Sequence, residues 1–502
     1  MTNEQTLQKA REFLARVQSN RSISSDLKAI VNYLPNSEYE LILFMSTAPN
    51  NVWQGPVPPP PSGFTPGSGS IELGLFLYWI DNPNLLNLSQ FSFKDQLIIL
   101  GVIAGLEILL PNTQMTATNY NYLQTNELIY NDGSVLATEQ FATFDQNWFI
   151  AFLNLAQTVS YNAWYNGGIF PTSPAPPVIN LQGAQPDTVN IAVLGDWGSG
   201  SSTARQLMTQ ITGLNPDYIL HVGDVYYAGT PLTTDPNGSI YFSPGEEMAN
   251  LNNLWPSAYP GKSFTLNSNH EMYSGGNGFF SDALGLSSSP NGSGVFSAQE
   301  GSTCFVLQFG GWSLLGLDSA FMSPLTSALM TGSIGGVYGT QGQWIQGLVK
   351  NNTISPDNTI VFTHHNGFAD DTTSASPLWA EINGALGADP YAWYWGHVHN
   401  GIVYNAPITI PSVPGQPGLT TNTWARCLGH AALPYGLSGN LSGKAGIAWN
   451  ANTPQPAPSK QLYNGFAILT LSTASGSMVI TENFYDLGGP NPTWTKQIYP
   501  AT

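Results

Sequence analysis

All seven histidines of this chain lie beyond residue 220, and five of them fall in a series of short motifs that also contains Asp, Asn and Glu. Five such motifs occur in chain order: Gly195-Asp196-Trp197-Gly198, Gly223-Asp224-Val225-Tyr226-Tyr227, Asn269-His270-Glu271, Thr363-His364-His365 and Gly396-His397-Val398-His399. The first, second and fourth directly follow an apolar, β-rich run, and the third lies three residues beyond one. Side chains at the carboxyl ends of strands in an open α/β sheet converge on one crevice. The pattern therefore predicts an α/β fold with one polar site.

Histidine and aspartate gathered at strand ends are typical of a metal site. Two cations held close together need one carboxylate between them to screen their repulsion, and imidazoles, an amide oxygen and further anions complete each coordination sphere. His397 and His399 point to opposite sides of an extended backbone, so they can serve different metals. We therefore predict a centre with two metal ions.

The chain is expected to contain two domains. Residues 1–168 show helical patterns and no His or Cys, residues 169–187 form a proline-rich linker, and residues 188–502 alternate strand-like runs with helical segments. Alternating strands and helices followed by strands are typical of a layered α/β sandwich. We therefore expect a mainly helical accessory domain followed by a catalytic domain.

The charge balance excludes several classes of protein. With 13 Lys and Arg against 31 Asp and Glu, the net charge is −18, which argues against a basic groove for nucleic acid. The chain is 42% hydrophobic and only 9% charged, which excludes an intrinsically disordered protein. Cys304 and Cys427 can form one disulfide at most, so this is no disulfide scaffold.

No segment of the sequence is typical of a membrane span. The most apolar run, residues 96–110, is shorter than the ~20 residues that cross a bilayer and contains Glu107. We interpret it as a buried helix, with a re-entrant membrane segment as the alternative. No signal-peptide pattern is visible, so a cytoplasmic location is expected.

At this point the sequence resembles the calcineurin-like metallophosphoesterases, and more closely the purple acid phosphatases of the small, tartrate-resistant type. The resemblance rests on the motifs D-x-G, G-D-x-x-Y, G-N-H-[DE], V-x-x-H and G-H-x-H, in that order over about residues 188–410. One departure is Ser268, which stands where the family has Gly before Asn269. The resemblance implies a four-layer α/β/β/α sandwich.

The resemblance also implies a set of metal ligands. Asp196, Tyr227 and His399 would bind the first metal, Asp224 would bridge, and Asn269, His364 and His397 would bind the second. Many relatives have a His where this chain has Gly198, and Tyr227 would replace it. A phenolate ligand favours Fe(III), so Fe(III) with a divalent Fe, Zn or Mn ion is expected. The alternative for Tyr227 is a packing role in the core.

The implied activity is hydrolysis of a small-molecule phosphate ester, most simply a monoester, by a metal-bound hydroxide. His270 would protonate the leaving alcohol and Glu271 would orient its ring. We interpret His221 and His365 as core residues packed behind the ligands. Two alternatives stay open: a phosphodiesterase or phospholipid-headgroup hydrolase on the same core, and a binding scaffold without activity.

Overall fold

The computed structural model describes scattered residues between 151 and 170, and residues 176–501 apart from 233–240, 242, 287–293, 326–328, 413–417, 434–440 and 457–460. The chain divides into two units, Met1–Ser160 and Tyr161–Thr502, and the fold below is that of the second unit. The predicted helical domain over residues 1–168, including the apolar run at 96–110, lies almost entirely outside the described residues.

Six strands of this unit form a mixed sheet in the order β16-β15-β14-β2-β3-β4. Their bounds are β2 Thr188–Leu194, β3 Tyr218–His221, β4 Ser263–Thr265, β14 Gly465–Ser472, β15 Val479–Asp486 and β16 Trp494–Tyr499. β2, β3 and β4 run parallel to one another. The first three sequence motifs therefore follow neighbouring parallel strands and meet at one edge.

A second sheet of the described residues has the order β1-β5-β6-β7-β8-β12-β9-β13. Its strands are β1 Val178–Asn180, β5 Phe305–Phe309, β6 Trp312–Gly316, β7 Thr359–Phe362, β8 Ala392–Trp395, β9 Gly401–Tyr404, β12 Trp424–Leu428 and β13 Ile447–Asn450. β7 and β8 are parallel, so the last two motifs also follow adjacent strands. A small antiparallel pair, β10 (Ile408–Ile410) and β11 (Leu419–Thr421), completes the described strands.

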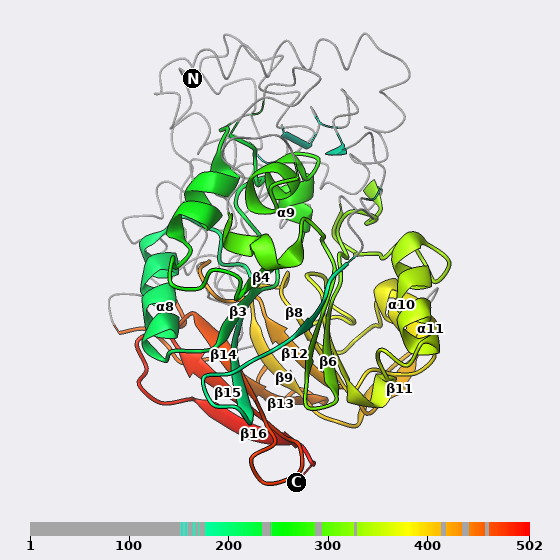
Figure 1. Ribbon diagram of the computed structural model, residues 1–502. Helices are drawn as coiled ribbons and strands as arrows, with labels where there is room; N and C mark the ends of the chain where they lie inside the picture. The colour runs from blue at the N-terminus through cyan, green and yellow to red at the C-terminus, as the bar shows by residue number, and fades with distance from the viewer. Residues whose placement is uncertain are drawn as a thin grey trace, which may run out of the picture. The chain divides into compact units, whose positions relative to one another are not determined.

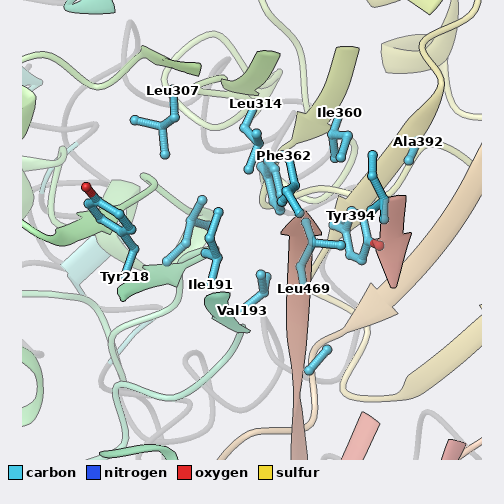
Figure 2. Close-up of a cluster of buried hydrophobic side chains, with 14 of the residues drawn as sticks. Ile191, Val193, Tyr218, Leu307, Leu314, Ile360, Phe362, Ala392, Tyr394 and Leu469 are labelled. Atoms are coloured by element: carbon cyan, nitrogen blue, oxygen red, sulfur yellow. The ribbon is translucent and has the colours of Figure 1, made fainter. Parts of the chain in front are cut away.

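The two large sheets pack face to face over a common core. Apolar side chains of both sheets fill the space between them, among them Ile191, Val193, Leu314, Ile360 and Phe362, and each of these is fully buried (Figure 2). The burial of such side chains contributes roughly 1.5–3 kcal/mol each to folding. This layer fixes the sheets relative to each other.

Helices cover the outer faces of the sheets (Figure 1). The helices of four residues or more with α geometry are α8 Ser202–Gly213, α9 Asn269–Met272, α10 Thr340–Lys350 and α11 Pro377–Leu386. Single π-helical turns are η5 Glu247–Leu251 and η7 Phe279–Ala283. The 3₁₀ segments are η6 Asn252–Leu254, η8 Gly294–Gln299 and η10 Pro356–Asn358. α10 and α11 share a second apolar core with the eight-stranded sheet. The predicted layered α/β sandwich is confirmed for the described residues.

Local sequence signals explain where the longer helices begin and end. The Ser201 side chain accepts a hydrogen bond from the Ala204 N–H at the start of α8, and Ser376 caps α11 in the same way. Gly387 ends α11 with a φ of 81°, which glycine adopts without steric cost. No helix of the described residues is both apolar enough and long enough to cross a membrane.

The predicted proline-rich linker contains a strand that the sequence pattern did not reveal. β1 pairs in parallel with β5, with Val178 opposite Val306. Three residues between prolines and glycine are too few to show the alternation that identifies a strand. The eight-stranded sheet therefore begins inside residues 169–187.

A buried ion pair joins the two sheets through β12 and β15. The Arg426 guanidinium on β12 donates from Nε to both Glu482 carboxylate oxygens on β15 at 2.8 Å, and from a terminal nitrogen as well. Both side chains have zero exposure. The Tyr394 hydroxyl adds a 2.7 Å hydrogen bond to Glu482. The pair is thus fully hydrogen-bonded, which is the condition for tolerating buried charges.

Removing one partner of this pair is expected to be far more damaging than removing both. Glu482→Ala leaves a buried, uncompensated guanidinium and should lower the free energy of unfolding by about 3–5 kcal/mol. The double variant Arg426→Met with Glu482→Met should recover most of that loss. Urea unfolding followed by tryptophan fluorescence measures both. Equal destabilisation of the single and double variants would contradict this account.

Candidate metal centre

The motif residues converge where strands of both sheets end. Asp196 follows β2, Asp224 follows β3, and Asn269 opens α9 after β4. His364 follows β7, and the loop between β8 and β9 carries His397 and His399. Backbone hydrogen bonds tie these loops together, from Gly396 N to the His364 carbonyl and from Asp196 N to the Gly223 carbonyl. Six of the seven predicted ligands therefore meet at one place.

A first group of donor atoms surrounds one side of Asp224. The Tyr226 hydroxyl lies 2.7 Å from Asp224 Oδ2, 3.1 Å from Asp196 Oδ1 and 3.1 Å from His399 Nε2. His399 Nε2 is also 3.3 Å from Asp196 Oδ1. Two carboxylates, a phenol and an imidazole thus face a common point.

A second group surrounds the other oxygen of the same carboxylate. His364 Nε2 lies 3.2 Å from Asp224 Oδ1 and 2.8 Å from Asn269 Oδ1. His397 Nδ1 is 3.2 Å from Asn269 Oδ1. Asp224 therefore presents one oxygen to each group, which is the arrangement of a carboxylate that bridges two cations.

The tyrosine that reaches the carboxylates is Tyr226, one residue before the predicted Tyr227. Tyr227 is buried, and its carbonyl oxygen accepts a 2.6 Å hydrogen bond from His270 Nδ1. Adjacent tyrosines have the same chemistry, and the motif alone gives only their spacing from Asp224. Which ring faces the site depends on the backbone after Asp224, so the ligand role of Tyr227 stays a prediction.

Carbonyl oxygens fix the tautomers of two of the predicted ligand histidines. A carbonyl only accepts hydrogen bonds, so His364 Nδ1 donates to the Val222 carbonyl at 2.9 Å and His397 Nε2 donates to the Met330 carbonyl at 3.1 Å. In each ring the nitrogen that faces Asn269 Oδ1 is then the one with a lone pair available for a metal. Met330, which no motif indicated, therefore contributes to the site through its backbone.

The backbone is strained at three of the predicted ligands. Asp196, Asp224 and His397 have φ values of 59°, 80° and 69°, in the left-handed region that residues other than glycine rarely adopt. Strain of this kind costs about 1–3 kcal/mol per residue and clusters at functional sites. A Cβ on Gly396 would lie 2.5 Å from Asp196 Oδ2, so only glycine lets the histidine loop approach this closely.

Electrostatics at the site follow from burial and from the two carboxylates. Burial and the charge of Asp224 raise the pKa of Asp196 well above its ordinary value. Burial also pushes the pKa of Asp224 upward, but the imidazoles of His364 and His270 outweigh it and hold that pKa well below its usual range. Burial lowers the pKa of His364, His397 and His399, which favours the neutral imidazole that a metal requires.

The donor atoms fit a pair of bound cations. Asp196 and Asp224 are 0% and 1% exposed, and neither forms an ion pair with Lys or Arg among the described residues. Asp224 Oδ1 is buried without a hydrogen-bond partner. Asp196, Asp224 and His364 can present ligand atoms within 4.8 Å of one another. Two adjacent buried carboxylates are costly unless positive charge lies between them.

His270 and Glu271 lie beside this centre with different partners. The His270 ring lies 4.6 Å from the Tyr226 ring and 4.9 Å from the Tyr273 ring, and its Nδ1 donates to the Tyr227 carbonyl. The Glu271 carboxylate accepts from the Ser268 hydroxyl at the start of α9. The hydrogen bond that orients the His270 ring is made to a backbone carbonyl. The orienting role that the sequence predicted for Glu271 stays a prediction.

The remaining histidines near the centre are held by protein atoms. His365 has Ser319 Oγ 2.9 Å from Nδ1 and donates from Nε2 to the Leu329 carbonyl at 2.7 Å. His221 Nδ1 lies 3.1 Å from Thr265 Oγ1. Although His365 can also present an atom near His364 and His397, both of its nitrogens are engaged.

Comparison with known proteins identifies the part of the chain that carries this centre. Residues 189–401 match the model of the calcineurin-like phosphoesterase family. A similar solved structure is described as GAP50, the anchor in the inner membrane complex of Plasmodium; it is 14% identical, covers 62% of this chain and 88% of its own, and has a TM-score of 0.39. No curated protein sequence matches this chain.

Metal removal is expected to destabilise the protein only while Asp224 is intact. A ligand that binds the folded state alone stabilises it, so chelation should lower the Tm of the metal-loaded wild type by about 10 °C. Asp224→Asn removes the charge shared by both donor groups, so chelation should then change Tm by less than about 2 °C. Differential scanning calorimetry with elemental analysis measures both quantities.

The exposed Asp357 provides a matched control for this experiment. Asp357→Asn removes the same charge at a site remote from the motifs and should respond to chelation as the wild type does. Equal chelator sensitivity in Asp224→Asn and the wild type would rule out Asp224 as the bridging ligand.

Proposed function

We propose that the calcineurin-like phosphoesterase domain of this chain hydrolyses phosphate monoesters in the manner of a purple acid phosphatase, with Fe(III) at the first position and a divalent Fe, Zn or Mn ion at the second. Proteins of the calcineurin-like phosphoesterase family are typically hydrolytic. The observation that carries the proposal is the position of Asp224, whose Oδ2 faces a group containing a phenol and whose Oδ1 faces a group of imidazole and amide donors.

The two groups differ in the cation they suit. Asp196, Asp224 and Tyr226 supply anionic or ionisable oxygens to the first group, a hard donor set that suits a highly charged cation. Asn269, His364 and His397 supply neutral donors to the second, which suits a divalent ion. When bound, two such ions activate water for attack on phosphorus and neutralise charge on the phosphoryl oxygens.

Tyr226 requires a strong cation to become a phenolate. Burial and the charges of Asp196 and Asp224 raise its pKa well above the ordinary value for tyrosine. The phenol is therefore protonated in the absence of metal and donates its proton to a carboxylate. A cation held beside the hydroxyl would lower the pKa of Tyr226, because its positive charge would offset the negative charge of the two carboxylates.

His270 is placed to act on the leaving group. Since Nδ1 donates to the Tyr227 carbonyl, Nε2 is the nitrogen that can carry a proton to a leaving alcohol. The side chain is only 7% exposed, so solvent competes poorly for that proton. We assign His270 as the proton donor and the Tyr227 carbonyl as the group that orients it.

Two other functions would use the same residues differently. A phosphodiesterase or phospholipid-headgroup hydrolase would need the same donors, so comparison of monoester and diester turnover separates it from a monoesterase. A scaffold without activity would have no need to retain ligands. The chain has all six of the predicted Asp, Asn and His donors, with a tyrosine hydroxyl beside them, which favours an enzyme over the scaffold.

The colour of the iron-loaded protein tests the phenolate. Tyr226→Phe keeps the ring and removes only its oxygen, so the visible charge-transfer band should disappear while Tyr227→Phe keeps it. Visible absorption, with iron content measured in parallel, checks both variants. Loss of the band in Tyr227→Phe alone would restore Tyr227 as the ligand, and a band that survives both substitutions would refute the phenolate.

A leaving-group series tests the role of His270. His270→Ala should keep both metals and lose roughly 10²–10⁴-fold in turnover of alkyl esters, which need protonation of the leaving oxygen. The loss should be much smaller for nitrophenyl esters, whose leaving group departs as an anion. Equal losses with both classes, at unchanged metal content, would contradict proton donation.

A further inference from the structure

Four acidic side chains gather inside the protein on segments that flank α9. They come from η5 and the residue before it, from α9 and from η7: Glu246, Glu247, Glu271 and Asp282. Their exposures are 9%, 0%, 0% and 0%. The charge of Glu247 interacts with each of the other three. The group is therefore one electrostatic unit.

The hydrogen bonds of this unit are unevenly distributed. Glu246 accepts from the Ala228 N–H at 2.8 Å, and Asp282 accepts from the Leu232 N–H at 2.8 Å. Glu271 accepts from Ser268 through Oε2. In contrast, both carboxylate oxygens of Glu247 and Oε1 of Glu271 are buried with no hydrogen-bond partner among the described residues. These three oxygens lack the donors that buried oxygens normally have.

The side chains of Glu247 and Glu271 both approach Gly229. A Cβ built on Gly229 would lie 3.0 Å from Glu247 Oε2 and 2.8 Å from Glu271 Cγ. The Gly229 carbonyl accepts only a 3.2 Å hydrogen bond from Ser274 Oγ among the described side chains, so one of its lone pairs remains available. The Glu247 carboxylate and the Glu271 side chain therefore both lie against the α-carbon of Gly229.

Among the described residues, no basic side chain forms an ion pair with Glu247 or Glu271. The described ion pairs involve Asp224, Asp196, Glu482 and Asp371. None of them includes Glu247 or Glu271. Burying ionised carboxylates without a counter-charge costs several kcal/mol per group. Glu247 and Glu271 must therefore either bind a cation or lose their charge by protonation.

We propose that Glu247 and Glu271, with the Gly229 carbonyl, bind a calcium ion separate from the dinuclear centre. The donors are all oxygens, which suits a hard cation and not the ions that prefer nitrogen or sulfur. Ca²⁺ accepts irregular mixtures of carboxylate, carbonyl and water, whereas Mg²⁺ demands a near-octahedral shell. Because Glu271 lies on α9 with Asn269 and His270, the ion would hold η5 against the helix that carries both residues.

Calcium titration of the full chain tests this site. The wild type, first freed of metal by chelation and then loaded with Zn²⁺, should bind one further equivalent of Ca²⁺ by isothermal titration calorimetry. Saturating Ca²⁺ should raise Tm by about 5 °C. Glu247→Gln keeps the shape of the side chain and removes its charge, so both effects should disappear. Absence of binding to the wild type would overturn the proposal.

Two controls separate this site from the dinuclear centre and from general charge effects. His364→Ala removes a ligand of the second group and should keep the response to Ca²⁺. Glu300→Gln, which removes an exposed carboxylate, should also keep it. A response lost in His364→Ala but kept in Glu247→Gln would assign the calcium to the dinuclear centre and overturn the proposal.

A second variant covers the case in which Glu247→Gln does not fold. Glu247→Asp keeps the charge but shortens the side chain, and should bind Ca²⁺ at least about tenfold more weakly. Unchanged affinity would overturn the proposal. If the carboxyl groups of Glu247 and Glu271 share a proton instead, the wild type binds no calcium, and Glu247→Gln is at least as stable as the wild type. That outcome would also overturn the proposal.

Discussion

The arrangement of the described site depends on the repulsion between two buried carboxylates. Asp196 and Asp224 lie side by side beyond the carboxyl ends of the adjacent strands β2 and β3. Neither forms an ion pair with Lys or Arg among the described residues. The surrounding groups are imidazoles, a phenol and an amide. In a low-dielectric interior such a pair is tolerated when cations neutralise it. The positive φ values at both aspartates show that the backbone accepts strain to keep them together.

The sheets provide the rigidity that this strain requires. The predicted ligand loops begin at the ends of parallel strands whose side chains are buried, apart from Thr188 and Asn190 of β2. Hydrogen bonds join the loops across the two sheets. Arg426 and Glu482 add a buried link between the layers. Precise sites need support of this kind, because a ligand displaced by 1 Å no longer meets its cation.

The helix α9 connects the dinuclear centre with the acidic cluster behind it. Asn269 faces His364 and His397, whereas the Glu271 side chain, two residues later, lies against Gly229. One short helix thus lies between two concentrations of buried negative charge. Occupation of one site would be felt at the other through the position of this helix, since Asn269 and Glu271 cannot move independently.

The sequence by itself determined the fold class of the described part and six of the residues at the site. Asp196, Asp224 and His364 follow strand-like runs, and the carboxyl ends of parallel strands meet at one edge, so their convergence is a consequence of local pattern. The motif order and spacing then identified the family model that residues 189–401 match.

Only the tertiary structure decided which groups meet across segments. Spacing could not distinguish Tyr226 from Tyr227, because the backbone after Asp224 determines which ring turns inward. It could not show that the Tyr227 carbonyl orients His270, that Met330 orients His397, or that β1 pairs inside the expected linker. Glu247 and Glu271 likewise become neighbours only when Gly229 lets their segments approach. A local pattern specifies residues along one segment, whereas contacts between segments depend on packing that sequence separation does not encode.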